Sequence, residues 1–162
     1  MKILFIQTGG SIDKTYPKIR GYKFEIDEPA VKTILKRVNP NFDYEIVTLL
    51  KKDSRDMDDK DRQKIFDYCE KTKYENIIIT HGTDTMVQTA RKLGTIKDKL
   101  IVITGAMLPE KFYESDAMFN VGTATGAVNC LEKGVYLAMN GRVYYWDDVK
   151  EDLKEGRFVN LD

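Results

Sequence analysis

The sequence is poor in the residues that form disulfide and metal sites: it has two cysteines and one histidine among 162 residues. Cys69 and Cys130 are far apart and form no CxxC pair, which excludes a disulfide framework. A zinc site of the usual ligand types is excluded as well, because one histidine and no cysteine cluster cannot supply its ligands. We therefore expect no metal, and two small, buried, reduced cysteines.

The chain also has no net charge and no long apolar run. Its 26 basic residues match its 26 acidic residues, so no overall field attracts nucleic acid or an anionic membrane, and we expect neither as a partner. The apolar run at the amino terminus is too short for a signal peptide and is ended by Gly9-Gly10. No stretch is long enough to span a bilayer. The sequence therefore predicts a cytoplasmic protein.

Three common nucleotide and hydrolase motifs are absent. The sequence has no GxGxxG, no GxxxxGK[ST] and no GxSxG, which argues against a Rossmann dinucleotide site, a P-loop and a nucleophile elbow. A flavodoxin-like phosphate cradle at Thr8–Ser11 stays open, although it does not explain the later pair Thr83-Asp84.

Short apolar runs alternate with amphipathic stretches along the whole chain. With 42% hydrophobic and 32% charged residues, this is the balance of a globular protein, and no linker or repeat divides it, so we expect one domain over residues 1–162. The strands are apolar throughout rather than alternating, so both faces are covered. Repeated strand–helix units of this size predict an α/β fold, a three-layer doubly wound and mainly parallel sheet. The strands are expected near residues 2–7, 44–50, 76–80, 99–104 and 134–139.

Helices are expected between the strands. Apolar residues at helical spacing predict a first helix over residues 31–38, with Asp27 ahead of it as a start signal. Asn140-Gly141 predicts a hairpin into residues 142–146, followed by a short acidic helix. The remaining helices are expected over residues 58–73, from Met86 to Leu93, and over residues 116–131.

Polar residues collect where the expected strands end. In a doubly wound sheet, ligands bind beyond the carboxyl ends of the strands. The segments that fall there carry hydroxyls, glycines and carboxylates: Thr8–Ser11, Asp53–Asp56, Thr80–Asp84 and Thr104–Met107. Taken singly, each has a simpler explanation as a strand exit or a helix cap, and His81 alone is more often a satisfied structural histidine. Their gathering at one edge favours a site.

These segments resemble the bacterial-type L-asparaginase family. Thr8–Ile12 is similar to the first signature of that family, TGGTI, and Thr80–Met86 matches the second signature, THGTDTM, without a change. Gly105–Pro109 resembles the GAMRP segment, and Ser115-Asp116 with Phe119-Asn120 resembles the SADGPFN stretch after it. The four motifs follow the family order across nearly the whole chain. The resemblance implies the fold of the asparaginase amino-terminal domain.

The resemblance also implies hydrolysis of asparagine, or a related small amide, to the acid and ammonia without any cofactor. Ser11 would be the nucleophile in place of the usual threonine, assisted by Tyr22, and Thr83 would be the second catalytic hydroxyl. Ser54 would hold the substrate α-carboxylate and Asp84 the α-ammonium group. Backbone N–H groups near Gly10 and Thr83 would form the oxyanion hole.

Two further expectations concern what surrounds that site. Arg55 stands where the family has a neutral residue, so we expect it to favour ligands with an extra negative charge. The family has a second, carboxyl-terminal domain, which is expected to be absent here. Its partner lysine for the second threonine would fall near residues 158–161, where no lysine stands, so Lys150 and Lys154 on the last helix are the nearest candidates.

Three functions follow from these expectations. The first is an amidohydrolase of weak or altered activity. The second is a decayed site that binds or senses aspartate, asparagine or a similar small acid. The third is a structural partner that docks on another chain. A homo-oligomer is left open, because the aromatic run Tyr144–Trp146 could form an apolar surface or cover the core.

Overall fold

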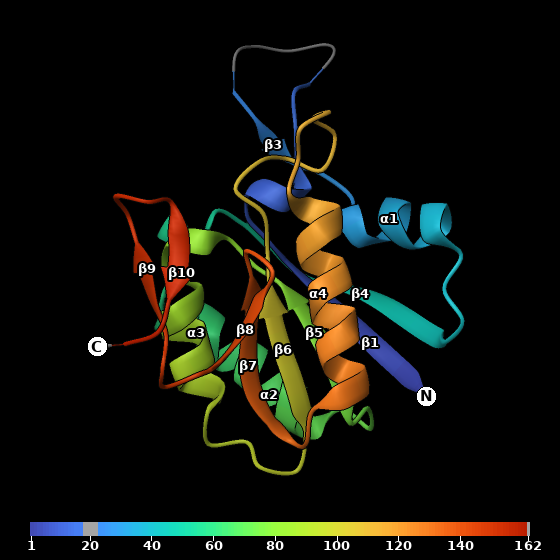
Figure 1. Ribbon diagram of the computed structural model, residues 1–162, viewed down its shortest axis with the longest axis vertical. Helices are drawn as coiled ribbons and strands as arrows, with labels where there is room; N and C mark the ends of the chain where they lie inside the picture. Colours follow the sequence, from blue (N-terminus) through green and yellow to red (C-terminus); the bar gives the residue numbers. More distant parts are fainter. Residues whose placement is uncertain (18–22, 162) are drawn as a thin grey trace.

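The computed structural model describes residues 1–17 and 23–161 and is built around one six-stranded sheet. The strand order is β4-β1-β5-β6-β7-β8, and every neighbouring pair is parallel except β7 with β8 (Figure 1). Its strands are β1 (Lys2–Gly9), β4 (Asp43–Lys52), β5 (Asn76–Thr80), β6 (Leu100–Thr104), β7 (Gly134–Met139) and β8 (Arg142–Tyr145). The five expected strands and the mainly parallel sheet are therefore confirmed.

Helices cover both faces of the sheet, as the continuous apolar strands predict. Helices α1 (Ala30–Val38) and α4 (Ala117–Cys130) lie on one face, and α2 (Asp59–Lys71) and α3 (Met86–Leu93) on the other. A hydrophobic core lies on each face of the sheet, and alternate side chains of β1 point into one core or the other. Phe5 faces α1 and α4, and Ile6 faces α2 and α3. The three-layer α/β fold is confirmed.

The Asn140-Gly141 hairpin forms as expected. Asn140 has φ 55° and Gly141 has φ 78°, and the two residues join β7 to the antiparallel β8. A two-residue turn with positive φ at both positions matches the right-handed twist of the strands that it connects. In the aromatic run that follows, Tyr144 is buried in the core, while Tyr145 is exposed. That run therefore covers the core in part.

Three sequence predictions are wrong in detail. The first N–H of α1 is not capped by Asp27; Ala30 N donates to Asp13 Oδ1 at 2.8 Å, a contact between residues distant in sequence. Cys69 is buried as expected, but Cys130 is exposed because the buried face of α4 ends at Val128. The acidic helix expected after residue 146 does not form.

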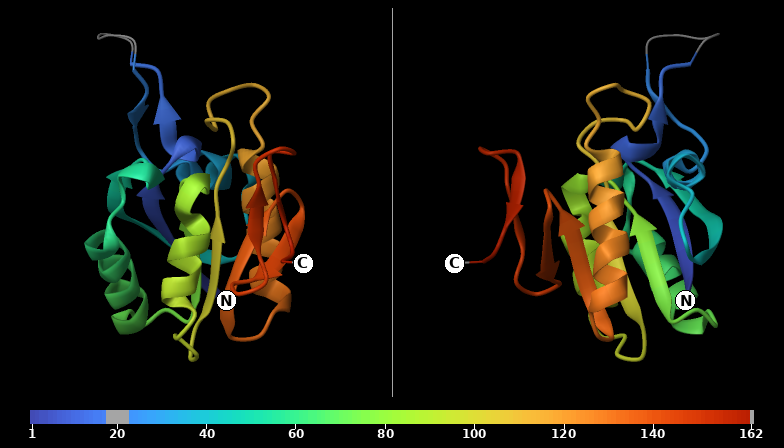
Figure 2. Two further views of the ribbon diagram at one scale, coloured as in Figure 1. Left: turned by 90° about the vertical axis from the view of Figure 1, so that its left-hand side faces the viewer. Right: turned by 45° about the vertical axis from the view of Figure 1, so that its right-hand side comes forward.

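A β-hairpin takes the place of that acidic helix. Strands β9 (Lys150–Asp152) and β10 (Arg157–Val159) pair antiparallel, and Gly156 between them has φ 61°. Figure 2 shows this hairpin standing out from the body of the molecule. Phe158 is 2% exposed and packs into the same core as α3. Burial of the Phe158 side chain thus favours this strand pair, although the charged residues of the segment had predicted a helix.

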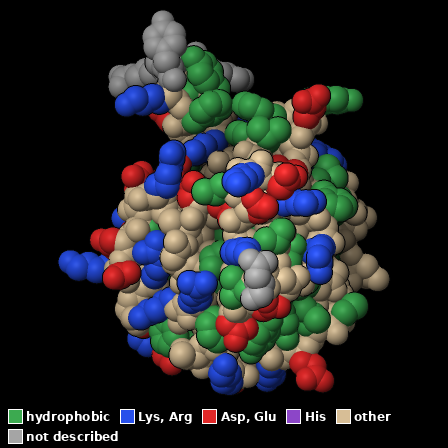
Figure 3. Space-filling view, turned by 60° about the vertical axis from the view of Figure 1, so that its left-hand side comes forward, with side chains coloured by type: hydrophobic (Ala, Val, Ile, Leu, Met, Phe, Trp, Pro, Cys, Tyr) green, Lys and Arg blue, Asp and Glu red, His purple; other side chains and the backbone are tan. Residues whose placement is uncertain are grey.

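A second, shorter strand pair rises above the carboxyl end of the sheet. Strands β2 (Lys14–Thr15) and β3 (Glu25–Ile26) pair antiparallel at the base of the loop that contains Tyr22, which lies outside the described residues. In the space-filling view, hydrophobic side chains lie at this end and again over the lower half of that face, with positive and negative groups mixed among them (Figure 3). Within the described ranges, no helix is both long and apolar enough to cross a bilayer.

Candidate active site at the carboxyl end of the sheet

Three strand exits meet in backbone contact at the carboxyl end of the sheet. A Cβ placed on Gly10 would come within 2.3 Å of Gly82 Cα, and one on Gly82 within 2.5 Å of Ser54 Oγ. Gly10 also has φ 87°, a conformation that other residues rarely adopt. Thr85 Oγ1 donates to the Ser54 carbonyl at 2.8 Å and joins the second exit to the third. The glycines are therefore required because only bare backbone fits between these turns.

This contact brings the expected site residues together. Each exit continues as a short 3₁₀ turn: η1 (Ser11–Asp13), η2 (Ser54–Asp56) and η3 (Thr83–Thr85). Ser11 and Thr83 directly follow the touching glycines, and both are partly exposed. Neither hydroxyl has a hydrogen-bond partner within residues 1–17 and 23–161. The nucleophile candidates thus follow two turns that touch, and neither hydroxyl is hydrogen-bonded to a base in the described part of the chain.

Ser54 differs from the other two hydroxyl residues in its burial. Its side chain is 1% exposed, and its Oγ has no hydrogen-bond partner among the described residues. A buried hydroxyl without a partner is costly, and such atoms are uncommon in native structures. A ligand oxygen that accepted from Ser54 Oγ would remove this cost, which fits the expected role of Ser54 with a carboxylate.

Charged groups alternate along the mouth of the site. Lys14 Nζ lies 2.7 Å from Asp53 Oδ2, and Arg55 Nε lies 3.3 Å from Asp53 Oδ1 and 3.9 Å from Asp84 Oδ2. Partial burial acts to raise the pKa of Asp53, but hydrogen bonds from Lys14 and Arg55 outweigh it and lower the pKa to about 2. Arg55 thus links η2 to η3, and part of its charge is balanced before any ligand binds.

His81 stabilises the third strand exit, after β5, from inside the protein. It is fully buried; its Nδ1 lies 2.7 Å from the Gly82 carbonyl and its Nε2 lies 2.8 Å from Thr89 Oγ1. Burial lowers the pKa of His81 to about 4, so the ring is neutral near pH 7. Both ring nitrogens are occupied by these contacts. His81 is therefore a structural residue that orients the turn carrying Thr83, and it is not free to act as a base.

The two later motifs hold the fourth exit in place. Asp116 accepts hydrogen bonds from the backbone N–H groups of Met107 at 3.0 Å and Leu108 at 3.1 Å. Buried Asn120 donates to the Gly105 carbonyl at 3.0 Å and to Asp116 Oδ2 at 2.8 Å. These side chains satisfy the backbone of a loop that has left the sheet, so this part of the resemblance is structural in role.

Asp13 is a buried acid close in sequence to Ser11 that the sequence reasoning missed. Its side chain is 3% exposed, its Oδ1 accepts from Ala30 N, and its Oδ2 has no partner among the described residues. Burial raises the pKa of Asp13 to about 7. It lies beside a cavity of about 110 Å³ lined in part by Ile12, Asp27 and Lys111. Asp13 thus joins the Ser11 turn to α1, and its position two residues after Ser11 was the available signal.

The expectation that Lys150 and Lys154 lie on a helix is wrong, since Lys150 opens β9 and Lys154 lies in the turn of the hairpin. In the same segment, burial raises the pKa of Glu151, and the negative charge of Asp84 raises it further. Among the residues described, no three histidine, cysteine, aspartate or glutamate side chains are grouped so that they could hold a metal.

Comparison with known proteins agrees with the fold and the motifs. Residues 2–151 match the family model of the asparaginase amino-terminal domain. L-asparaginase from Thermococcus kodakarensis is 30% identical over 151 residues, which are 88% of this chain and 45% of that protein. L-asparaginase 2 of Escherichia coli strain K12 is 41% identical over 93 residues, 54% of this chain and 26% of that protein.

The structural comparison covers the whole chain. The solved structure of the thermostable L-asparaginase from Thermococcus kodakarensis superposes with a TM-score of 0.83 at 27% identity, over 99% of this chain and 51% of that one. The chain therefore spans about half the length of the asparaginase structure that it matches. The family model nonetheless matches residues 2–151, which are most of this chain. This chain therefore belongs to the asparaginase family.

Proposed function

We propose that the protein is an asparaginase-type amidohydrolase that cleaves asparagine or a related small amide to the acid and ammonia, with weak or altered activity. The observation that carries this proposal is the contact between Gly10, Gly82 and Ser54, which gathers three strand exits. Ser11 and Thr83 follow the two touching glycines, Asp84 follows Thr83, and the Ser54 hydroxyl has no partner among the described residues. These residues supply the hydroxyl nucleophile that an acyl transfer requires, and the missing base is the reason for the weak activity.

In this proposal each residue has one task. Ser54 Oγ donates to the α-carboxylate of the substrate, and Asp84 accepts from its α-ammonium group. Ser11 attacks the amide carbon and releases ammonia, with Tyr22 assisting, and Thr83 acts in the second hydroxyl position. The backbone N–H groups near Gly10 and Thr83 stabilise the negative charge that develops on the carbonyl oxygen. Water then releases the acid.

The test is ammonia release from asparagine, glutamine and simple amides by the purified protein. Release that depends on the substrate side chain supports the amidohydrolase. Thermal stabilisation by aspartate or asparagine without any release favours the second candidate, a binding or sensing module. That candidate is supported by the Ser11 and Thr83 hydroxyls, which have no hydrogen-bond partner among the described residues. Recovery of a stable complex with another chain, without release or ligand binding, favours a structural partner.

The charge of Arg55 leads to a prediction about ligand preference. We expect aspartate to bind more tightly than asparagine, and Arg55→Gln to reduce this preference by about 2- to 5-fold, the range of an exposed ion pair. The effect is modest because Arg55 is 71% exposed in its side chain and is already paired with Asp53. Titration calorimetry with both ligands measures it. Arg91→Gln on α3, also exposed, is the matched control, and an unchanged preference in Arg55→Gln would show that its guanidinium points to solvent.

We propose the cytoplasm as the compartment of this chain. Both cysteines are free, which is consistent with the cytoplasm as its compartment. Residues 1–162 are proposed to act as one domain on a small-molecule substrate.

A further inference from the structure

The cavity of about 110 Å³ beside Asp13 lies outside the site described above. Three segments that are distant in sequence line it: the η1 turn, the residues that lead into α1, and the loop between β6 and α4. Charged residues make up much of its described lining, with three lysines and the carboxyl groups of Asp13, Asp27, Glu28 and Glu110. A cavity of this size has room for a few water molecules or for one small ion.

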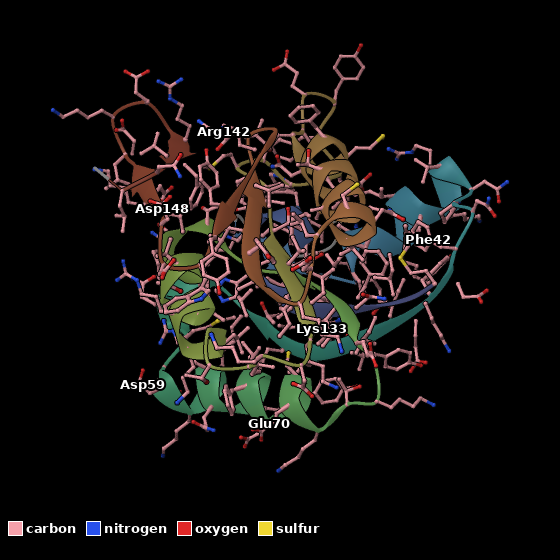
Figure 4. The ribbon with its side chains drawn as sticks, turned by 60° about the horizontal axis from the view of Figure 1, so that its bottom comes forward. Phe42, Asp59, Glu70, Lys133, Arg142 and Asp148 are labelled. Carbon is pink, nitrogen blue, oxygen red and sulfur yellow. The ribbon has the colours of Figure 1, made fainter. Side chains whose placement is uncertain are left out.

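The walls of this cavity are fixed by backbone contacts and by the core. Glu110 N donates to the Ile12 carbonyl at 3.1 Å, which joins the loop after β6 to η1. Ile12 and Ala30 are both buried in the core that α1 and α4 share. Phe42, which follows the other end of α1, packs against the same core (Figure 4). The helix is therefore anchored at both ends, and the cavity is part of the folded structure.

Two buried carboxyl oxygens of the lining have no hydrogen-bond partner among the described residues. They are Asp13 Oδ2 and Glu110 Oε1. Asp13 is 3% exposed, and the side chain of Glu110 is 6% exposed. Buried polar atoms without a partner are costly and uncommon in native structures. An ionised carboxylate only accepts hydrogen bonds, so both oxygens lack a donor.

Asp13 also lacks a counter-charge. The other three acids of the lining lie within ion-pair distance of a cation: Glu110 of Arg37 at 3.1 Å, Asp27 of Lys111 at 2.5 Å, and Glu28 of Lys51 at 3.4 Å and of Lys32 at 3.9 Å. Lys14, the remaining lysine of the lining, lies 2.7 Å from Asp53. Within residues 1–17 and 23–161, no lysine or arginine forms an ion pair with Asp13. Ionised Asp13 thus leaves one negative charge uncompensated.

We propose that this cavity is a binding site for an ammonium ion, with Asp13 Oδ2 and Glu110 Oε1 as its hydrogen-bond acceptors. Ammonium supplies both the N–H donors that these oxygens lack and the single positive charge that Asp13 lacks. A divalent metal fits less well, because it takes about six or more oxygen ligands. Among the residues described, no three acids are grouped so that they could hold a metal. The site does not depend on the proposed function, whose product would be one source of the ion.

Binding should depend on the protonation of Asp13. Burial raises the pKa of Asp13 to about 7, against the lowering by hydrogen bonds from Ala30 N and Gln7 and by the charge of Lys51. Proton and ammonium compete for the same oxygen, so ammonium should bind above this pKa and be displaced below it. The charged groups around Asp13 are Lys14 on β2, Asp27 and Glu28 before α1, Lys32 on α1, Lys51 on β4, and Glu110 and Lys111 after β6.

The experiment measures thermal unfolding of the whole chain in ammonium, potassium or tetramethylammonium chloride at about 0.1 M, at about pH 8 and about pH 5. Potassium has the charge and nearly the size of ammonium but no N–H, and tetramethylammonium is bulky and has no N–H. At pH 8 we expect ammonium to raise the unfolding midpoint by about 3 °C over tetramethylammonium, as a roughly tenfold excess over the Kd would. Potassium should raise it less, and at pH 5 the ammonium effect should vanish.

Asp13→Asn should lose the ammonium effect at pH 8, because the amide has no negative charge and its own N–H groups take the place of the donor. Asp98→Asn, at an exposed loop aspartate, is the matched control and should keep the effect. An equal shift with all three salts would overturn the proposal, because it would be a general effect of salt. So would a shift equal at pH 5 and pH 8, or one that persists in Asp13→Asn. A potassium shift as large as that of ammonium would overturn the assignment to ammonium, since the N–H donors would then contribute nothing.

Discussion

Ser11→Ala is expected to abolish nearly all ammonia release from the preferred amide, because it removes the nucleophile and leaves only binding and the oxyanion hole. A hydroxyl is a poor nucleophile unless a base takes its proton. In the described part of the chain neither the Ser11 nor the Thr83 hydroxyl is hydrogen-bonded to such a base, so we expect wild-type activity about 10²- to 10⁴-fold below that of an intact family site. Thr83→Val, which keeps the shape of the side chain, should reduce activity to a similar level.

The double variant decides whether the two hydroxyls act as one unit. If they do, Ser11→Ala with Thr83→Val should lose little more activity than either single change, because removing one part already disables the whole. The controls are the midpoints of thermal unfolding. Both side chains are partly exposed and unpaired among the described residues, so stability should change by no more than about 0.5 kcal/mol. Activity that survives the double substitution would place the chemistry elsewhere.

The sheet could be predicted because its strands leave little choice of structure. Ile77-Ile78-Ile79 and Ile101-Val102-Ile103 are β-branched, apolar on both faces and bounded by polar turns, and in the structure all six are buried. Such runs are compatible with a covered parallel sheet and with little else of that length. The rule that ligands bind at the carboxyl edge then placed Ser11, Ser54 and Thr83 together before any contact was known.

The residues that were missed depend on contacts between distant parts of the chain. Asp13 has the appearance of an ordinary loop aspartate, and only the approach of α1 buries it. Glu151 stands in a charged stretch that favours a helix, and its place on a strand depends on the burial of Phe158, with which it pairs. Tertiary burial outweighs local propensity in both cases, and a single sequence does not record which segments will meet.

Asp13→Asn is expected to remove a fall in stability that the wild type shows between about pH 4 and pH 7. The unfolded chain loses the Asp13 proton near the ordinary aspartate pKa of 3.8, whereas burial raises the pKa of the folded state to about 7. Between these values the unfolded state binds fewer protons, so stability falls as pH rises and levels off above about pH 7. A difference of that size corresponds to a loss on the order of 4 kcal/mol.

Asparagine suits the position because its two atoms match those of the protonated acid. Its Oδ1 can accept from Ala30 N as the carboxyl does, and its amide N–H groups replace the proton on Oδ2. The variant should therefore equal the wild type near pH 4 and exceed it by up to about 4 kcal/mol near pH 8. Urea unfolding at a series of pH values measures the difference, with Asp98→Asn, an exposed loop aspartate, as the matched control. If Asp13→Asn keeps the wild-type slope, Asp13 is ionised in the folded protein at neutral pH, and the link between the Ser11 turn and α1 is a charged one.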